Sequence, residues 1–217
     1  RLERLAKELV GSIGPTRLTV DLDAIANNIK AIRSMAGPGV ELMSVVKSFG
    51  YGNDSIRTSR VALDNGVTYL AVAFPDEGAS LRENRVDAPI LVFNVLPEQV
   101  DKVVRYDLSA VVASEELAES LNCAASSSNR IKTHIKIDTG MGRSGIWHEC
   151  ADEFVKYVSR MPNLDVEGIM THFSSADDPQ SDFYTLEQVK AFDDLITRLE
   201  SAGHKFRYIH AANTSAL

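Results

Sequence analysis

The stretch Tyr69–Val95, YLAVAFPDEGASLRENRVDAPILVFNV, shows the folding pattern of the chain most plainly. It begins and ends with short apolar runs, Tyr69–Phe74 and Pro89–Val95, and such nearly continuous apolar character is typical of parallel strands buried on both faces. Between the two runs, Pro75 predicts the start of a helix, and the two acidic residues that follow suit the positive end of a helix dipole. The stretch therefore reads as a strand–helix–strand unit.

The same alternation continues in both directions along the chain. Further apolar runs predict strands at Glu41–Lys47, Ser109–Ala113, Lys132–Asp138, Val166–His172 and Tyr208–Asn213. Helical patterns predict helices at Asp23–Met35, Ser55–Asp64 behind Asp54, Glu98–Arg105 behind Pro97, a segment behind Ser114, and Thr185–Ala202. An earlier strand, Thr16–Val20, is predicted before the first helix.

This alternation predicts an α/β fold with a parallel sheet. We expect a (β/α)8 TIM-type barrel that is incomplete, with about seven of the eight strands present. A dinucleotide-binding fold has no support, because no Gly-x-Gly-x-x-Gly follows the first strand of the sheet. We assign residues 16–217 to the barrel and residues 1–15 to an N-terminal extension or linker.

Composition narrows the class of protein. The chain has 217 residues, 44% hydrophobic and 24% charged, which is enough to bury a sizeable core. Its formal net charge of -7 argues against a nucleic-acid partner, which would require clustered Lys and Arg. Cys123 and Cys150 form no redox or zinc pattern and indicate reduced thiols. No signal peptide opens the chain and no run approaches ~20 apolar residues, so we expect a cytoplasmic protein without a membrane partner.

The ends of the predicted strands are where chemistry is expected, because barrel enzymes place their active sites at the C-terminal ends of the strands. Lys47 follows a buried apolar run, and burial of an amine favours its neutral, nucleophilic form. The alternative is a lysine whose charged end reaches the solvent at the rim.

Two other strand ends carry basic side chains. Arg143 stands in a glycine-rich turn, and either contacts an anion or forms a rim salt bridge. His172 is a candidate base, a metal ligand or a core histidine. A metal set of His172 with Asp177, Asp178 and His210 matches no short ligand motif, so we predict no metal.

Four motifs at these strand ends resemble those of the alanine racemase family, the fold-type III pyridoxal-phosphate enzymes. They are Val45–Gly52 (VVKSFGYG), Lys136–Arg143 (KIDTGMGR), Thr171–Phe173 (THF) and His210–Asn213 (HAAN). The four occur in the family's order and span most of the chain.

The resemblance implies a cofactor, pyridoxal 5'-phosphate, and a residue that binds it covalently. Lys47 would hold the cofactor as a Schiff base and act as one of two acid–base groups. Tyr51 would bind the cofactor phosphate, together with the hydroxyl of Thr214.

The resemblance assigns the remaining site residues to the rest of the cofactor. Arg143 would hydrogen-bond its phenolic oxygen, and His172 and Asn213 would line its ring and surroundings. Lys136 matches a lysine that is carbamylated in some family members.

The implied reaction is the interconversion of L- and D-alanine, by removal of the Cα proton on one face and reprotonation on the other. The resemblance implies a cytoplasmic homodimer that makes D-alanine for the cell wall, with the second acid–base group, a tyrosine, in the C-terminal β-domain of the partner subunit. The chain stops at Leu217, before the family's last barrel strand, so we expect a fragment that is inactive alone.

Other activities stay open at this point. Several residues near the lysine depart from the family's usual pattern, which leaves the amino-acid substrate open; they are Ser48, Phe49, Gly50, Asn53 and Asp54. The alternatives are a racemase of another amino acid, a pyridoxal-phosphate homeostasis barrel that does not racemise, and a decarboxylase of the same fold type.

Overall fold

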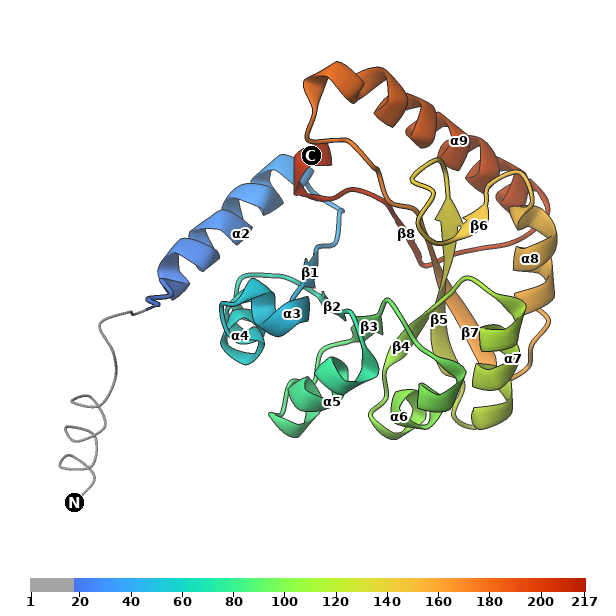
Figure 1. Ribbon diagram of the computed structural model, residues 1–217, viewed down its shortest axis with the longest axis horizontal. Helices are drawn as coiled ribbons and strands as arrows, with labels where there is room; N and C mark the ends of the chain where they lie inside the picture. The colour runs from blue at the N-terminus through green and yellow to red at the C-terminus, as the bar shows by residue number, and fades with distance from the viewer. Residues whose placement is uncertain (1–17) are drawn as a thin grey trace.

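The computed structural model describes residues 18–217 (Figure 1), and within them one sheet organises the chain. The strands are β1 (Met43–Val45), β2 (Tyr69–Val72), β3 (Ile90–Val92), β4 (Ser109–Val112), β5 (Ile131–Asp138), β6 (Ile146–Trp147), β7 (Leu164–Met170) and β8 (Tyr208–His210). Their order is β1-β2-β3-β4-β5-β7-β8, β6 pairs with β5, and every pairing is parallel. The predicted incomplete (β/α)8 barrel is confirmed.

Helices cover the outer side of this curved sheet (Figure 1), apart from the short segment Lys47–Tyr51, which lies at the C-terminal end of β1. They are α2 (Leu22–Ala36), α3 (Lys47–Tyr51), α4 (Ser55–Asp64), α5 (Pro75–Glu83), α6 (Val100–Arg105), α7 (Glu115–Ala124), α8 (Ala151–Val158) and α9 (Asp182–Ser201). Short 3-10 turns are η1 (Pro97–Gln99), η2 (Pro179–Ser181) and η3 (Thr214–Ala216). Among residues 18–217, no helix combines the length and apolar character needed to cross a membrane.

Alternate residues of each strand pack on opposite sides of the sheet, as the pleat requires. In β2, Leu70 and Val72 join the large cluster that includes Leu81 of α5 and the buried residues of the other outer helices. Tyr69 and Ala71 belong instead to a smaller cluster that contains strand residues and Phe93. The main core therefore lies between sheet and helices, and the second fills the inside of the curve.

The capping residues predicted for the helices behave as expected. The Asp54 carboxylate accepts hydrogen bonds from the first backbone N–H groups of α4, and Ser114 Oγ accepts one from Leu117 N at 3.3 Å. Pro75 is the first residue of α5. The segment behind Pro97 begins as the 3-10 turn η1 before α6 continues it.

All of the predicted strands of the sheet except the one that ends at Asp138 are too long at their C-terminal ends. Strands β1, β7 and β8 end at Val45, Met170 and His210. Lys47, His172 and Asn213 therefore lie beyond the strands. In β1 the cause is visible: Val46 N still donates to the Ala71 carbonyl of β2, but its ψ of 20° has already turned the chain out of the sheet. These three predicted site residues therefore lie on the connections that follow the strands, not on extended backbone.

The predicted strand Thr16–Val20 is wrong where it can be checked. Residues 16 and 17, and the predicted extension at 1–15, lie outside the described residues, and residues 18–20 form no strand. Asp21 follows at once and caps α2, accepting from Asp23 N and Ala24 N.

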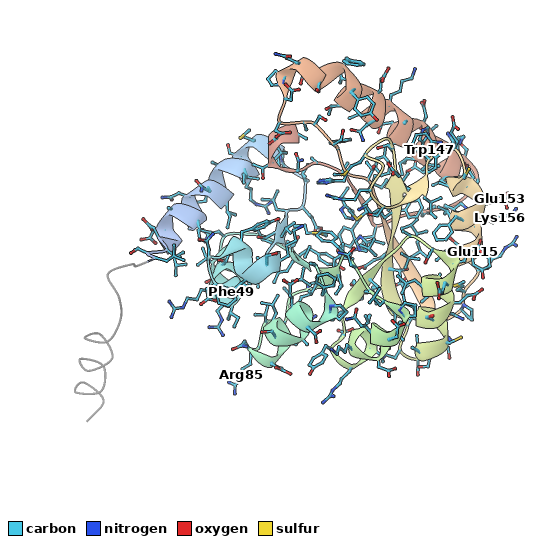
Figure 2. The ribbon with its side chains drawn as sticks, viewed as in Figure 1. Phe49, Arg85, Glu115, Trp147, Glu153 and Lys156 are labelled. Carbon is cyan, nitrogen blue, oxygen red and sulfur yellow. The ribbon has the colours of Figure 1, made fainter. Side chains whose placement is uncertain are left out.

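Helix α8 and strand β6 were not predicted. In α8, Glu153 and Lys156 point away from the sheet (Figure 2), whereas Phe154, Val155 and Val158 are buried. This is an ordinary amphipathic stripe that the sequence analysis overlooked. Strand β6 has only two residues, which is too short for any periodicity to show.

Candidate active site

Four basic side chains meet at the C-terminal ends of the strands. Lys47 follows β1, Lys136 lies near the end of β5, Arg143 stands in the loop after β5, and His172 follows β7. Burial lowers the pKa of His172, and the positive charges of Arg143, Lys136 and Lys47 lower it further. Burial also lowers the pKa of Lys136, with contributions from Arg143 and Lys47 that Asp138 partly opposes. The four residues thus form one electropositive site in an acidic chain.

The turn that carries Lys47 has an unusual backbone. Ser48, Phe49 and Gly50 adopt φ/ψ values of 53/50°, 57/40° and 66/37°, and Tyr51 has φ 53°, so α3 is a left-handed turn. Each non-glycine residue in this conformation costs roughly 1–2 kcal/mol. Strain of this kind persists where the surroundings enforce it, and it is found most often at functional sites.

Packing and hydrogen bonds hold this turn. Gly50 N donates to the Val46 carbonyl at 2.9 Å, and Gly52 N donates to the Ser48 carbonyl at 3.2 Å. A Cβ on Gly50 would lie only 3.0 Å from Ser55 N, so the glycine lets α4 approach closely. Phe49, labelled in Figure 2, is 65% exposed, so its side chain does not anchor the turn in the core.

Glu77 is a residue of this site that the sequence analysis treated only as a helix-start signal. One oxygen of its carboxylate accepts from Ser48 N at 2.6 Å, directly after Lys47. The other accepts from Ala73 N at 2.7 Å and from Phe74 N at 3.2 Å, at the end of β2. Glu77 therefore ties the lysine turn to the neighbouring strand end.

The loop that carries Arg143 is shaped by hydrogen bonds on both sides. Asp138 Oδ1 accepts from Gly140 N at 2.9 Å and from Gly142 N at 3.1 Å. Tyr184 OH, from α9, donates to the Gly140 carbonyl at 2.6 Å, and a Cβ on Gly140 would lie 2.4 Å from that hydroxyl oxygen. Close approach therefore requires a glycine at position 140.

Gln188 of α9 connects the loops after β5 and β7, and the sequence analysis missed it. It is 0% exposed. Its Nε2 donates to Thr139 Oγ1 and to the His172 carbonyl, both at 3.4 Å, and its Oε1 accepts from Ser174 N at 3.1 Å. A signal existed: Gln188 stands on the buried stripe of α9 with Phe192, four residues later, and a polar residue on an apolar stripe needs partners.

In the described part of the chain, the remaining predicted residues, Tyr51, Asn213 and Thr214, have no direct polar contact with the four basic residues. Asn213 Oδ1 accepts from Ala216 N at 3.1 Å and so caps η3. Thr214 is exposed, and Tyr51 is 62% exposed. Within residues 18–217, no hydrogen bond or ion pair connects Tyr51, Asn213 or Thr214 to the four basic residues.

Lys136 Nζ donates to Ser144 Oγ at 2.7 Å, beside Arg143. The residues weighed as a metal set do not form one: Asp178 caps η2, accepting from Gln180 N and Ser181 Oγ. In the part of the chain that the structure describes, no three His, Cys, Asp or Glu side chains are grouped as metal ligands.

A polar cluster lies inside the curve of the sheet. His134 Nδ1 is 2.8 Å from His210 Nε2, and His134 Nε2 is 3.3 Å from Glu167 Oε1. Tyr69 OH lies 2.6 Å from Ser109 Oγ and donates to Glu167 Oε1 at 2.8 Å. We call these five residues the inner cluster.

The electrostatics of the inner cluster follow from its burial. Burial, together with the neighbouring His134, lowers the pKa of His210 to about 3. Burial alone would raise the pKa of Glu167, but hydrogen bonds from His134 and Tyr69 bring it below its ordinary value. His210 is thus held neutral and Glu167 charged.

A β-bulge places Glu167 in this cluster. Thr133 pairs with Val166 and His134 with Gly168, so Glu167 is the extra residue on β7. A bulge redirects the side chain at which it occurs.

Comparison with known proteins identifies a family. The family model described as alanine racemase, N-terminal domain, matches residues 20–217. The alanine racemase of Halothermothrix orenii is 39% identical over 205 residues, which cover 94% of this chain and 54% of that protein. The chain spans about half the length of the curated relatives it matches.

Solved structures give the same result. The crystal structure of alanine racemase from E. faecalis matches with a TM-score of 0.85 at 34% identity, over 94% of this chain and 55% of that one. The alanine racemase from Bacillus anthracis with bound L-Ala-P matches with a TM-score of 0.83 at 35% identity, over 91% of this chain and 51% of that one.

Proposed function

This chain belongs to the alanine racemase N-terminal domain family, and from that premise we propose that it forms the cofactor-binding barrel of a racemase that interconverts L- and D-alanine with pyridoxal 5'-phosphate. The observation that carries the proposal is the meeting of Lys47, Lys136, Arg143 and His172 at the C-terminal edge of the sheet. The relative from Bacillus anthracis, with its bound L-Ala-P, supports an alanine-like substrate.

The residues of the site fit this cofactor. Pyridoxal 5'-phosphate carries an anionic phosphate, an ionisable phenolic oxygen and an aldehyde. Lys47 offers the amine that an aldehyde requires, and Arg143 offers a planar cation suited to an anionic oxygen. Four basic side chains gather at the site, although the chain as a whole carries a net charge of -7.

Each residue has a part in the proposed reaction. When bound, the cofactor spreads the negative charge left on Cα after a proton is removed. Lys47 Nζ would hold the cofactor covalently and then take or return the Cα proton on one face. Arg143 would bind the phenolic oxygen, and Tyr51 and Thr214 would bind the phosphate, while His172 and Asn213 would line the ring.

The second proton-transfer group is proposed to come from outside this chain. Racemisation needs an acid–base group on each face of Cα, and Lys47 provides one. We propose a homodimer in which a tyrosine of the partner subunit provides the other, so that residues 1–217 alone are inactive. This agrees with the chain's spanning about half the length of its relatives.

The proposed boundaries and location follow the same evidence. We propose residues 16–217 as the barrel and residues 1–15 as an extension or linker, which is supported by the family match starting at residue 20. We propose a cytoplasmic protein that supplies D-alanine for the cell wall. The two unpaired cysteines, Cys123 and Cys150, favour a reducing compartment.

Lys136 is proposed to be carbamylated. Its neutral Nζ would attack carbon dioxide and lose a proton, and its lowered pKa increases the neutral fraction. The resulting anion would lie beside Arg143. With 13C-bicarbonate, the natural full-length protein should show a carbamate carbonyl signal by NMR that Lys136→Arg abolishes. A protein without that signal would refute the modification.

The function is tested with the natural full-length protein in deuterated water. With L-alanine and added cofactor, we expect deuterium at Cα and loss of optical rotation, and Lys47→Ala should abolish both. Exchange and racemisation of another amino acid, but not of alanine, would show that alanine is not the substrate. Cofactor binding without exchange of any amino acid would instead support the homeostasis alternative.

A further inference from the structure

Glu77 is the third residue of α5, yet its carboxylate reaches beyond its own helix. Oε2 accepts from Ala73 N at 2.7 Å and Phe74 N at 3.2 Å, which is the ordinary capping of a helix start. Oε1 accepts from Ser48 N at 2.6 Å, 29 residues earlier in the chain. Capping of α5 needs only Oε2. The bond from Ser48 N to Oε1 is not part of the cap.

The bond from Ser48 lies where the strained turn begins. Ser48, Phe49 and Tyr51 all have φ between 53° and 57°, and the N–H of Ser48 is one residue after Lys47. Within residues 18–217, Glu77 supplies the single side-chain hydrogen bond to the backbone of this turn. The turn's other hydrogen bonds are between backbone groups at neighbouring positions, such as that from Gly50 N to the Val46 carbonyl.

The hydrogen bond from Ser48 N to Glu77 is of a strong type. A hydrogen bond to a carboxylate is about twice as strong as one between neutral groups. Glu77 is half-buried, and its helix is fixed to the sheet by Leu81, which is 0% exposed. The carboxylate is therefore attached to a helix that is fixed to the sheet, and it accepts from the backbone of a turn with positive φ values.

We propose that Glu77 is a positioning residue: by holding the left-handed turn from both the Ser48 N–H and the end of β2, it orients Lys47 toward the cofactor. The inference rests on the proposed function for what Lys47 does, but the contact itself is independent of it. Glu77 acts through the backbone of Ser48 and touches no reacting atom.

The variant Glu77→Gln separates the two tasks of the carboxylate. Glutamine at this position still caps a helix, because its amide oxygen can accept from Ala73 N and Phe74 N. Its amide nitrogen is then left facing Ser48 N, and two donors cannot bond. Glu83→Gln is the matched control, because Glu83 lies on the same helix and accepts from Tyr106 OH at 2.8 Å.

Attachment of pyridoxal 5'-phosphate to Lys47 is measured in the natural full-length protein by quenching with borohydride at timed intervals and mass spectrometry. Since a hydrogen bond to a charged group is lost, we expect Glu77→Gln to slow attachment about tenfold, with thermal unfolding equal to that of Glu83→Gln. Equal attachment rates in the two variants would overturn the proposal.

A second variant keeps the test decisive if Glu77→Gln also unfolds. Glycine adopts positive φ without strain, so Ser48→Gly should restore attachment, or folding, in the Glu77→Gln background if Glu77 holds the turn. A double variant as defective as Glu77→Gln would show that Glu77 serves the fold in general and would contradict the proposal.

A readout without cofactor distinguishes this inference from the proposed function. Amide hydrogen exchange at Gly50 N should be faster in Glu77→Gln than in Glu83→Gln, because the turn opens. A further outcome is that the unmodified protein is never labelled with the cofactor at Lys47 while Glu77→Gln still exchanges faster at Gly50 N. In that case the proposed function is wrong, but Glu77 does hold the turn. Equal exchange rates at Gly50 N in the two variants would show that Glu77 does not hold the turn.

Discussion

Lys47, Lys136, Arg143 and His172 come from three parts of the chain, and each follows or closes a strand of a parallel sheet. Because the C-terminal ends of parallel strands share one edge, these three parts of the chain meet although no local sequence motif joins one part to another. Burial, and then their mutual repulsion, lowers the pKa values of His172 and Lys136. Anionic ligands would relieve it.

His172 should be neutral at pH 7. Burial, and then the charges of Arg143, Lys136 and Lys47, lower its pKa below the ordinary value of about 6.5. An NMR titration of the imidazole should show this, and Arg143→Gln should raise the pKa only partway, because burial remains. A His172 that titrates at or above the ordinary value, or is unaffected by Arg143→Gln, would contradict the arrangement.

His210 should make the protein less stable in mild acid. Its folded pKa, about 3, is below the unfolded value of about 6.5, so between these values the unfolded state binds more protons and stability falls as pH falls. From pH 7 to pH 5 the loss is roughly 2 kcal/mol. Urea unfolding should show this, with a flatter profile in His210→Asn and an unchanged one in His204→Asn. A flat profile in the unmodified protein would refute the lowered pKa.

Strand β7 is shaped around a side chain of its neighbour β5. A Cβ on Gly168 would lie 2.3 Å from His134 Nδ1, and His134 is 0% exposed. The histidine ring therefore occupies the space that a side chain at position 168 would take, and the bulge at Glu167 directs a carboxylate to the other ring nitrogen. The shape of β7 and the hydrogen bonds of the inner cluster therefore depend on each other.

Gly168→Ala should destabilise the fold by about 1–3 kcal/mol, because overpacking forces His134 out of its hydrogen bonds. Gly78→Ala in α5 is the comparison. Its Cβ would lie 2.9 and 3.0 Å from the two methyl carbons of Leu108, a milder overlap than the one at Gly168, and alanine favours the helix by about 0.5–1 kcal/mol. Urea unfolding that ranks Gly78→Ala as the more damaging change would contradict the packing described.

Elements with a regular pattern were predictable, and irregular ones were not. The apolar runs located seven strands in the right order, and Asp54, Pro75 and Ser114 marked helix starts. The turn after Lys47 was not predictable, because serine, phenylalanine and tyrosine give no signal for positive φ. Enforcement comes from Glu77, a residue distant in sequence.

The sequence predicted that Lys47, Arg143 and His172 gather at one edge of the sheet, but it did not predict the residues that support them. Lys47, Arg143 and His172 could be found because the barrel fold says where strands end, and their family motifs agree. Gln188 and Glu77 act through hydrogen bonds to backbone and side chains far along the chain, and a contact of this kind leaves no local pattern.

At the scale of the whole molecule, the sheet begins at β1 and ends at β8, so the described part forms an open curve with the site along one edge (Figure 1). Its relatives are about twice as long as the stretch they share with this chain. The proposal therefore divides the reaction: this barrel holds the cofactor and one proton-transfer group, and the partner subunit supplies the other.

The central claim is that Lys47 holds the cofactor, and one measurement tests it most directly. The natural full-length protein is incubated with pyridoxal 5'-phosphate, reduced with borohydride, digested, and analysed by peptide mass spectrometry. The account predicts a phosphopyridoxyl group on Lys47 and none on Lys136. A label on Lys136 instead, or no specific label, would contradict it.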